Sequence, residues 1–149
     1  MATTIIVADA VVTLSVSLTL AGKPYDIEFS KTISDVTRAD RNIVPVPFET
    51  EVSVVQLFAA AIEKGTFTDF NGFFIMNRDD TNAIRLRFAR SGGDTVDIQL
   101  NPGDFFVLYN NQLSVNTTEA AFVGFVDMET ISMQAVTAEV DVEYLAIQI

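Results

Sequence analysis

Alternation of apolar and polar residues is clearest in the middle of the chain, between Phe73 and Tyr109. Residues 84–89 and 95–100 alternate strictly, which predicts two strands, each with one buried face. Arg85 and Arg87 give the outer face of the first strand a positive charge. Residues 73–76 and 105–109 are apolar runs and complete an antiparallel meander. Turns are predicted at Gly92-Gly93-Asp94 and at Asn101-Pro102-Gly103-Asp104, because Gly takes positive φ and Pro presets φ.

An N-terminal hairpin is predicted from a second region of alternation. The even-numbered residues from 12 to 20 are apolar, whereas the odd-numbered residues between them all carry hydroxyl groups. Residues 25–30 alternate in the same way and form the partner strand, after a turn at residues 21–24. The hydroxylated face bears no charge and could lie against another subunit; its members are Thr13, Ser15, Ser17 and Thr19.

The remaining segments are less regular. Residues 34–42 are polar without period and are predicted to form an exposed loop, and Pro45 and Pro47 confine the next segment to the edge of a sheet. Residues 51–62 fit a strand or a helix, and we favour a strand through Phe58. Further strands are expected at residues 113–115, 122–126 and 135–149, the last with a bulge near Tyr144 because its apolar parity changes there.

These elements predict an all-β protein. Eight to ten strands, at most one short helix and closely spaced turns are typical of an antiparallel β-sandwich, with jelly-roll connectivity as the best single topology. We expect an N-terminal arm over residues 1–10 and one sandwich domain over residues 11–149. No internal repeat or second compositional region divides the chain.

The hydrophobic fraction of 49% is high for a monomer. No stretch is apolar enough to span a bilayer, and no basic leader of a signal peptide precedes the first strand. We interpret the apolar excess as subunit interface; the alternative is a core rich in Phe.

Histidine and cysteine are both absent. Disulfides, thiolate metal sites and histidine-based catalysis are therefore excluded, and we expect a protein that is not an enzyme and carries no cofactor or metal. A net charge of −11 makes nucleic acid an improbable partner, because phosphate binding depends on Lys and Arg. The arginine strand could pair with acidic residues of the same chain or meet a neighbouring copy, and we favour the first interpretation.

Three clusters suggest sites, and each has a simpler interpretation. Residues 77–82 offer several oxygens, as a calcium loop does, but lack the glycine and glutamate positions of that motif, so a backbone turn is favoured. Glu139, Asp141 and Glu143 share a strand face, which is expected to be solvated or, second, paired with the arginine strand. The aromatic residues are expected in the core rather than as a sugar platform: Phe105, Phe106, Tyr109, Phe122 and Phe125.

The stretch from Phe73 to Tyr109 resembles small jelly-roll virion proteins of tailed bacteriophages. The shared features are an apolar strand that ends in Asn77, the Pro102-Gly103-Asp104 turn and the aromatic strand after it, followed by a β-rich segment at residues 138–149. The resemblance covers about the last half of the chain. It implies a capsid decoration (cement) protein that binds the major capsid protein as a homotrimer, or a subunit of a tail or fibre that binds a host receptor or glycan.

The resemblance therefore implies a location on the capsid surface of a virion, after synthesis in the host cytoplasm, with no membrane or nucleic-acid partner. The N-terminal arm or the loop at residues 34–42 is expected to reach the capsid lattice. Other subunits are expected to pack against the hydroxylated strand face or against the Phe-rich strands, and the arginine strand could also meet a neighbouring copy. The expected interface residues are Ala2, Ile5, Val7, Thr13, Ser15, Ser17, Thr19, Arg38, Arg41, Arg85 and Arg87.

Overall fold

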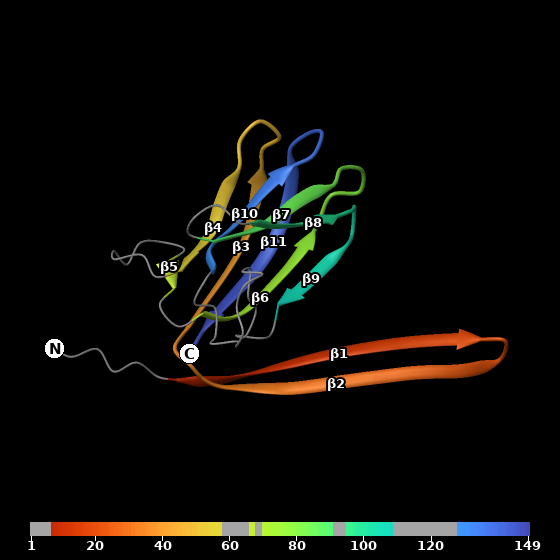
Figure 1. Cartoon of the computed structure of the whole chain (residues 1–149). Coiled ribbons are helices and arrows are strands. Elements are labelled where there is room, and N and C mark those ends of the chain that lie inside the picture. Colours follow the sequence, from red (N-terminus) through yellow and green to blue (C-terminus); the bar gives the residue numbers. More distant parts are fainter. Residues whose placement is uncertain (1–6, 58–65, 68–69, 91–94, 109–127) are drawn as a thin grey trace. The chain divides into compact units, whose positions relative to one another are not determined.

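The computed structural model describes residues 7–57, 66–67, 70–90, 95–108 and 128–149 (Figure 1). Every regular element within these residues is a β-strand, and eleven strands form three sheets. The predicted all-β class and the antiparallel β-sandwich are confirmed. The chain contacts divide into two units, residues 1–38 with Ile149 and residues 39–148.

The first unit contains a long hairpin, β1 (Ala8–Leu20) and β2 (Lys23–Val36). Its two-residue turn has Ala21 at φ 51° and Gly22 at φ 77°, as a type I′ turn requires. The sequence placed the N-terminal boundary after residue 10 and this hairpin inside the sandwich domain. In the structure the two strands pair only with each other among the described strands, which is why they form a unit of their own.

The second unit is the sandwich. One sheet has the order β5-β4-β10-β7-β8 and the other has the order β3-β11-β6-β9. The bounds are β3 Arg38–Val46, β4 Val52–Leu57, β5 Thr66–Phe67, β6 Phe70–Asn77, β7 Ile84–Arg90, β8 Thr95–Leu100, β9 Phe105–Leu108, β10 Met128–Ala135 and β11 Val140–Gln148.

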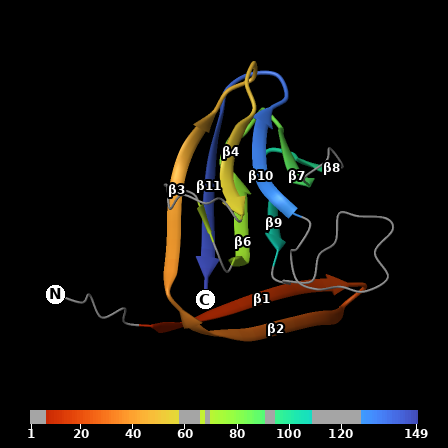
Figure 2. The ribbon, with the colours of Figure 1, turned by 60° about the vertical axis from the view of Figure 1, so that its left-hand side comes forward.

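The sandwich strands pair in a nested order. β7 pairs with β8, β6 with β9, β4 with β10, and β3 with β11, so that the chain folds as one long double ribbon. Figure 2 shows the outermost pair, β3 and β11, side by side and running in opposite directions. Rolling this ribbon places alternate pairs in opposite sheets, which is the predicted jelly-roll connectivity. The two-residue strand β5 is added in parallel at the edge next to β4.

The core lies between the two sheets and follows the predicted alternation. Inward residues of β7 are at most 1% exposed, and those of β11 are buried at every second position from Val140 to Ala146. Each fully buried side chain of this size contributes about 1.5–3 kcal/mol. The buried cluster consists of Val46, Phe73, Ile75, Ile84, Leu86, Phe88, Leu100, Leu108, Ile131, Met133, Ala135, Val140, Val142, Tyr144 and Ala146.

Asn77 ends β6 and is fully buried although it is polar. Its Nδ2 donates to the carbonyl oxygens of Asn82 at 2.8 Å and Leu100 at 3.2 Å, and its Oδ1 accepts the N–H of Asp79 at 3.0 Å. Its own N–H donates to the carbonyl of Asp104 at 2.9 Å. Asn77 therefore joins the turn after β6 to the end of β8, and so joins one sheet to the other.

The turn between β8 and β9 has the predicted chemistry. Pro102 and Gly103 occupy its centre, Gly103 has φ 75°, and the N–H of Asp104 donates to the carbonyl of Asn101 at 3.0 Å. This is the geometry in which Pro followed by Gly is favoured. The Asp104 carboxylate also accepts the N–H of Asn101 at 3.0 Å, which fixes the turn from outside.

Several local predictions were wrong. The strands within residues 73–109 do not form one meander, because β7 pairs with β8 in one sheet while β6 pairs with β9 in the other. The loop expected at residues 34–42 is strand, because β2 runs to Val36 and β3 begins at Arg38. The strand expected from residue 135 to 149 is β11 alone, preceded by a turn at residues 136–139, and its register shift falls at Ile147/Gln148 rather than near Tyr144. By contrast, β3 with its Pro45 is an edge strand, as predicted.

Some predictions lie outside the described residues. They are the glycine turn before β8, the strands at residues 113–115 and 122–126, and the stretch after Leu57 that was read as strand or helix. β4 confirms the strand reading as far as Leu57.

Candidate interaction surfaces

The arginine strand β7 forms ion pairs within its own chain. Arg87 Nη2 lies 2.7 Å from Asp97 Oδ2 on β8, and Arg87 Nη1 lies 3.1 Å from Glu51 Oε2. Arg85 Nη2 lies 3.1 Å from the same Glu51 oxygen. Asp97 lies directly opposite Arg87 in the β7–β8 register. The favoured interpretation, pairing across a sheet, describes this strand, although Glu51 comes from before β4 and not from the acidic C-terminal half.

These contacts shift the pKa values of Asp97 and Arg87. The hydrogen bond from Arg87 lowers the pKa of Asp97 below its usual value, and the nearby arginine charges lower it further. The hydrogen bond to Asp97 raises the pKa of Arg87. Both groups therefore stay charged over the whole neutral range.

The same face is completed by polar side chains of β10. Ser132 donates to Glu51, and Gln134 donates to the carbonyl of Phe48 at 2.7 Å while it accepts from Arg85. We call this outward surface the polar face; it consists of Glu51, Arg85, Arg87, Asp97, Ser132 and Gln134.

The outward surface of the other sheet is apolar. In the strand register Phe74 lies opposite both Val107 and Leu145, and Met76 lies opposite Phe105. Phe105 is 59% exposed and Val107 is 38% exposed. We call this surface the apolar face; it consists of Phe74, Met76, Phe105, Val107 and Leu145.

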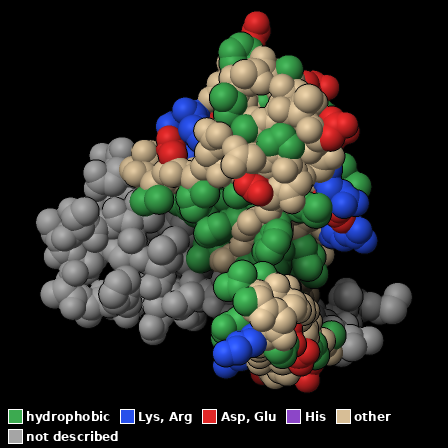
Figure 3. Space-filling model, turned by 90° about the vertical axis from the view of Figure 1, so that its right-hand side faces the viewer, with side chains coloured by type: hydrophobic (Ala, Val, Ile, Leu, Met, Phe, Trp, Pro, Cys, Tyr) green, Lys and Arg blue, Asp and Glu red, His purple; other side chains and the backbone are tan. Residues whose placement is uncertain are grey.

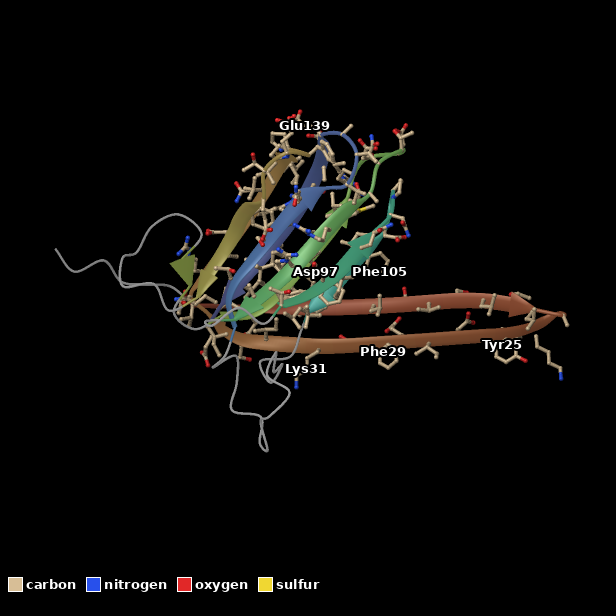
Figure 4. All side chains as sticks on the ribbon, turned by 45° about the horizontal axis from the view of Figure 1, so that its top comes forward. Tyr25, Phe29, Lys31, Asp97, Phe105 and Glu139 are labelled. Atoms are coloured by element: carbon tan, nitrogen blue, oxygen red, sulfur yellow. The ribbon has the colours of Figure 1, made fainter. Side chains whose placement is uncertain are left out.

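A shallow groove of about 320 Å³ crosses the apolar face and is lined by β6, β9 and β11. Figure 3 shows hydrophobic side chains gathered on one side of the sandwich. Figure 4 shows Phe105 projecting from β9. Phe105 was predicted to lie in the core, and this is wrong. Phe106, its neighbour, does pack on the core, with its ring 5.7 Å from that of Phe88.

Charged side chains border the apolar face at one end. Arg41 of β3 donates to Glu143 of β11, with Nε 2.8 Å from the carboxylate, and Arg78 Nε lies 3.1 Å from its other oxygen. The hydrogen bond from Arg41 and the two arginine charges lower the pKa of Glu143. Of the predicted acidic row, Glu139 and Asp141 are exposed, whereas Glu143 pairs with Arg41 and Arg78 and not with the arginine strand β7.

The N-terminal hairpin also exposes apolar side chains, and most of them lie on one of its two faces, with Val11 on the other. Its register places Leu14 opposite Phe29, Val16 opposite Ile27, and Leu18 opposite Tyr25. Figure 4 shows Tyr25, Phe29 and Lys31 projecting from the same side of β2. We call this surface the hairpin face; it consists of Leu14, Val16, Leu18, Leu20, Tyr25, Ile27 and Phe29, which are 40–61% exposed.

The residues predicted to form interfaces are thus distributed over both units. The hydroxylated residues of β1 lie on the side of the hairpin opposite the hairpin face, where Ser17 donates to Asp26 at 2.5 Å. Arg38 begins β3 and is half-buried, and Val7 is 50% exposed. Ala2 and Ile5 lie outside the described residues. That these residues form interfaces stays a prediction.

The calcium-like segment is a turn held by its own side chains. Asp79 Oδ1 accepts the N–H groups of Thr81 at 2.7 Å and Asn82 at 2.6 Å. These backbone hydrogen bonds lower the pKa of Asp79. Within the described residues, no three Asp, Glu, His or Cys side chains converge as metal ligands would.

The Phe-rich strands were one of the expected interfaces, but no residue of the apolar face was among the predicted interface residues, although a signal for them exists. Residues 73–76 and 105–108 are apolar at both parities, unlike residues 84–89. A strand that is apolar at both parities has no face reserved for water.

The described part of the chain contains no helix with the length and hydrophobicity that membrane crossing requires. Comparison with protein-family models, with curated proteins and with solved structures found no match.

Proposed function

We propose that this chain is a non-enzymatic structural protein of a virus particle, and that it works as a capsid decoration (cement) protein. It binds the lattice of the major capsid protein as a homotrimer and stabilises it by burying surface. The observation that carries the proposal is the exposed apolar surface on both units of the chain, the apolar face and the hairpin face.

Exposed apolar side chains that adjoin one another are typical of protein interaction sites. Phe105 and Phe29, each about 60% exposed, are the kind of aromatic anchor that carries most of the energy of an interface. The polar face, by contrast, keeps its arginines paired within the chain. These features support binding without chemistry.

The decoration role in particular is supported by the sequence resemblance to small jelly-roll virion proteins. The nested strand order agrees with the fold which that resemblance implies. The trimer and the capsid lattice come from the resemblance alone.

A tail or fibre module that binds a host receptor or glycan is the second candidate. Two exposed aromatic residues favour it: Phe48, 47% exposed, follows β3, and Phe105 follows the turn after β8. Aromatic residues at loop ends are suitable for stacking on a sugar.

The test is binding to capsids that lack this protein. We expect the purified chain to sediment with such capsids, to raise the temperature at which they rupture, and to be a trimer by light scattering in the bound or free state. Deletion of residues 1–9 should weaken binding if the predicted arm reaches the lattice. Binding to host cells or polysaccharide but not to capsids would instead establish the receptor module.

A further inference from the structure

The hairpin of the first unit is an unusual element because none of the other described strands is added to it. β1 and β2 have 13 and 14 residues and pair with each other only, among the described strands. A two-stranded hairpin alone is marginally stable in water, and independent stability requires further strands or packing against another element. The hairpin face therefore needs a cover.

The area available on the hairpin face is sufficient for a specific contact. Its seven side chains, at 40–61% exposure, present on the order of 600 Å². An interface of standard size buries about 800 Å² on each partner. Contact through the hairpin face alone thus comes close to that size.

Charge indicates which surface covers it. The strand register places Lys23 opposite Leu20 and Lys31 opposite Val12, so both lysines share the parity of the hairpin face. Between them this face has no carboxylate, because Asp26 and Glu28 have the other parity. Packing two hairpin faces together would bring lysines near lysines.

The sandwich unit has the opposite charge. Residues 39–148 contain sixteen Asp and Glu but six Lys and Arg, whereas residues 1–38 contain four and three. Two sandwiches repel each other, while a hairpin face ending in lysines is attracted to a sandwich. The apolar face has exposed Asp104 and Asp141 near its edges, and the two arginines that border it, Arg41 and Arg78, are paired with Glu143.

We propose that the hairpin face of one copy packs onto the apolar face of a neighbouring copy. The two-stranded ribbon lies over β11, β6 and β9 as a third layer, at the distance of about 10 Å that is ordinary for stacked sheets. One contact then covers both exposed apolar surfaces, with Phe105 and Val107 against Val16, Leu18 and Ile27.

This contact joins two different surfaces of the same chain. Repeated from copy to copy it closes a ring if the rotation allows, and three copies make the trimer of the proposed function. The inference rests on that function only for the number of copies. It specifies which residues of one subunit touch the next.

The chain has no cysteine, so disulfide trapping tests the contact directly. Val16→Cys is made in one copy and Val107→Cys in a second copy with a tag of different mass, and the mixture is oxidised. We expect a mixed disulfide to form at least about ten-fold faster than with the control Ser15→Cys, which lies on the other side of the hairpin, because contact raises the effective concentration.

Each other outcome overturns the inference. Fast cross-linking of Val16→Cys to itself would show that two hairpin faces pack together. Equal rates for Val16→Cys and Ser15→Cys would show that the apolar and hairpin faces do not meet. If wild-type protein still binds capsids in either case, the proposed function stands without this contact; if the cross-link forms but capsids are not bound, the function fails and the contact stands.

Discussion

The two outer faces of one sandwich differ in how they meet water. On the polar face, Arg87 and Asp97 form an ion pair across neighbouring strands, and polar side chains of β10 lie beside them. On the apolar face, Phe105 and Val107 are exposed although their strand is as regular as β8. The same fold thus has one outer face that is polar and one that exposes apolar side chains to water.

We therefore expect stability and the proposed assembly to depend on separate residues. The core between the sheets holds the fold together, and the polar face adds little because exposed ion pairs are weak. Exposed apolar side chains contribute to the free energy only when something covers them. The predictions below test that separation, in order of decreasing effect on stability.

Loss of the shared core should affect both faces alike. Phe88→Ala removes a ring that is 1% exposed and lies 5.7 Å from the ring of Phe106 in the other sheet. We expect the free energy of unfolding to fall by about 3–5 kcal/mol, the usual cost of such a cavity. Urea denaturation measures it. The control Val96→Ala, at a 44% exposed position of β8, should cost much less.

Loss of the hydrogen bonds by which Asn77 links the two sheets should cause the second largest loss of stability. Asn77→Ala leaves the buried carbonyls of Asn82 and Leu100 without the donor they now share, at a cost of about 2 kcal/mol. Asn101→Ala, an exposed position in the turn before β9, is the control and should cost less. Equal urea midpoints for the two variants would mean that Asn77 does not join the sheets.

The polar face should show a small effect that depends on pH. Because folding lowers the pKa of Asp97, its contribution is present at neutral pH and is lost as pH falls through that lowered pKa. We expect Asp97→Asn to cost about 0.5–1 kcal/mol at pH 7, as for other exposed ion pairs. The difference from wild type should shrink below about pH 4, near the ordinary pKa of Asp. Urea midpoints at a series of pH values would detect it, and a constant difference would contradict it.

The apolar face should show the smallest effect on stability and the largest on association. Replacing Phe105 with Ser and Val107 with Thr removes exposed apolar surface, so we expect the free energy of unfolding to change by less than about 0.5 kcal/mol. Self-association measured by light scattering should be lost. Gln99→Ser on β8 is the matched control and should associate as wild type does. Association unchanged by the first variant would remove the apolar face from the interface.

The fold was predictable from the sequence because alternation and turn chemistry agree in its clearest part. The alternation of residues 84–89 predicted which side chains of β7 are buried. Pro102-Gly103 predicted the turn between β8 and β9. The hairpin strands were also predicted, but not that both of their faces are exposed. Alternation shows which residues share a face of a strand and does not show whether anything covers that face.

The surfaces were less predictable for the same reason. Ser34 and Asp35 have polar side chains but lie in a strand, because an uncovered ribbon tolerates polar residues at both parities. Phe105 was assigned to the core because its side chain is hydrophobic, yet it is 59% exposed. The partners of Glu51 could not be predicted because they come from strands far away in the sequence.

The nested strand order has a consequence for the order of folding. The strands β7 and β8 are four residues apart, whereas β3 and β11 are separated by almost the whole sandwich. If the innermost pair forms first, each outer pair closes only the connections that remain rather than the whole intervening chain, and the entropy cost of distant pairing is divided into smaller steps. Substitutions in β7 or β8 should then slow refolding, whereas those in β3 should mainly speed unfolding, as stopped-flow measurements would show.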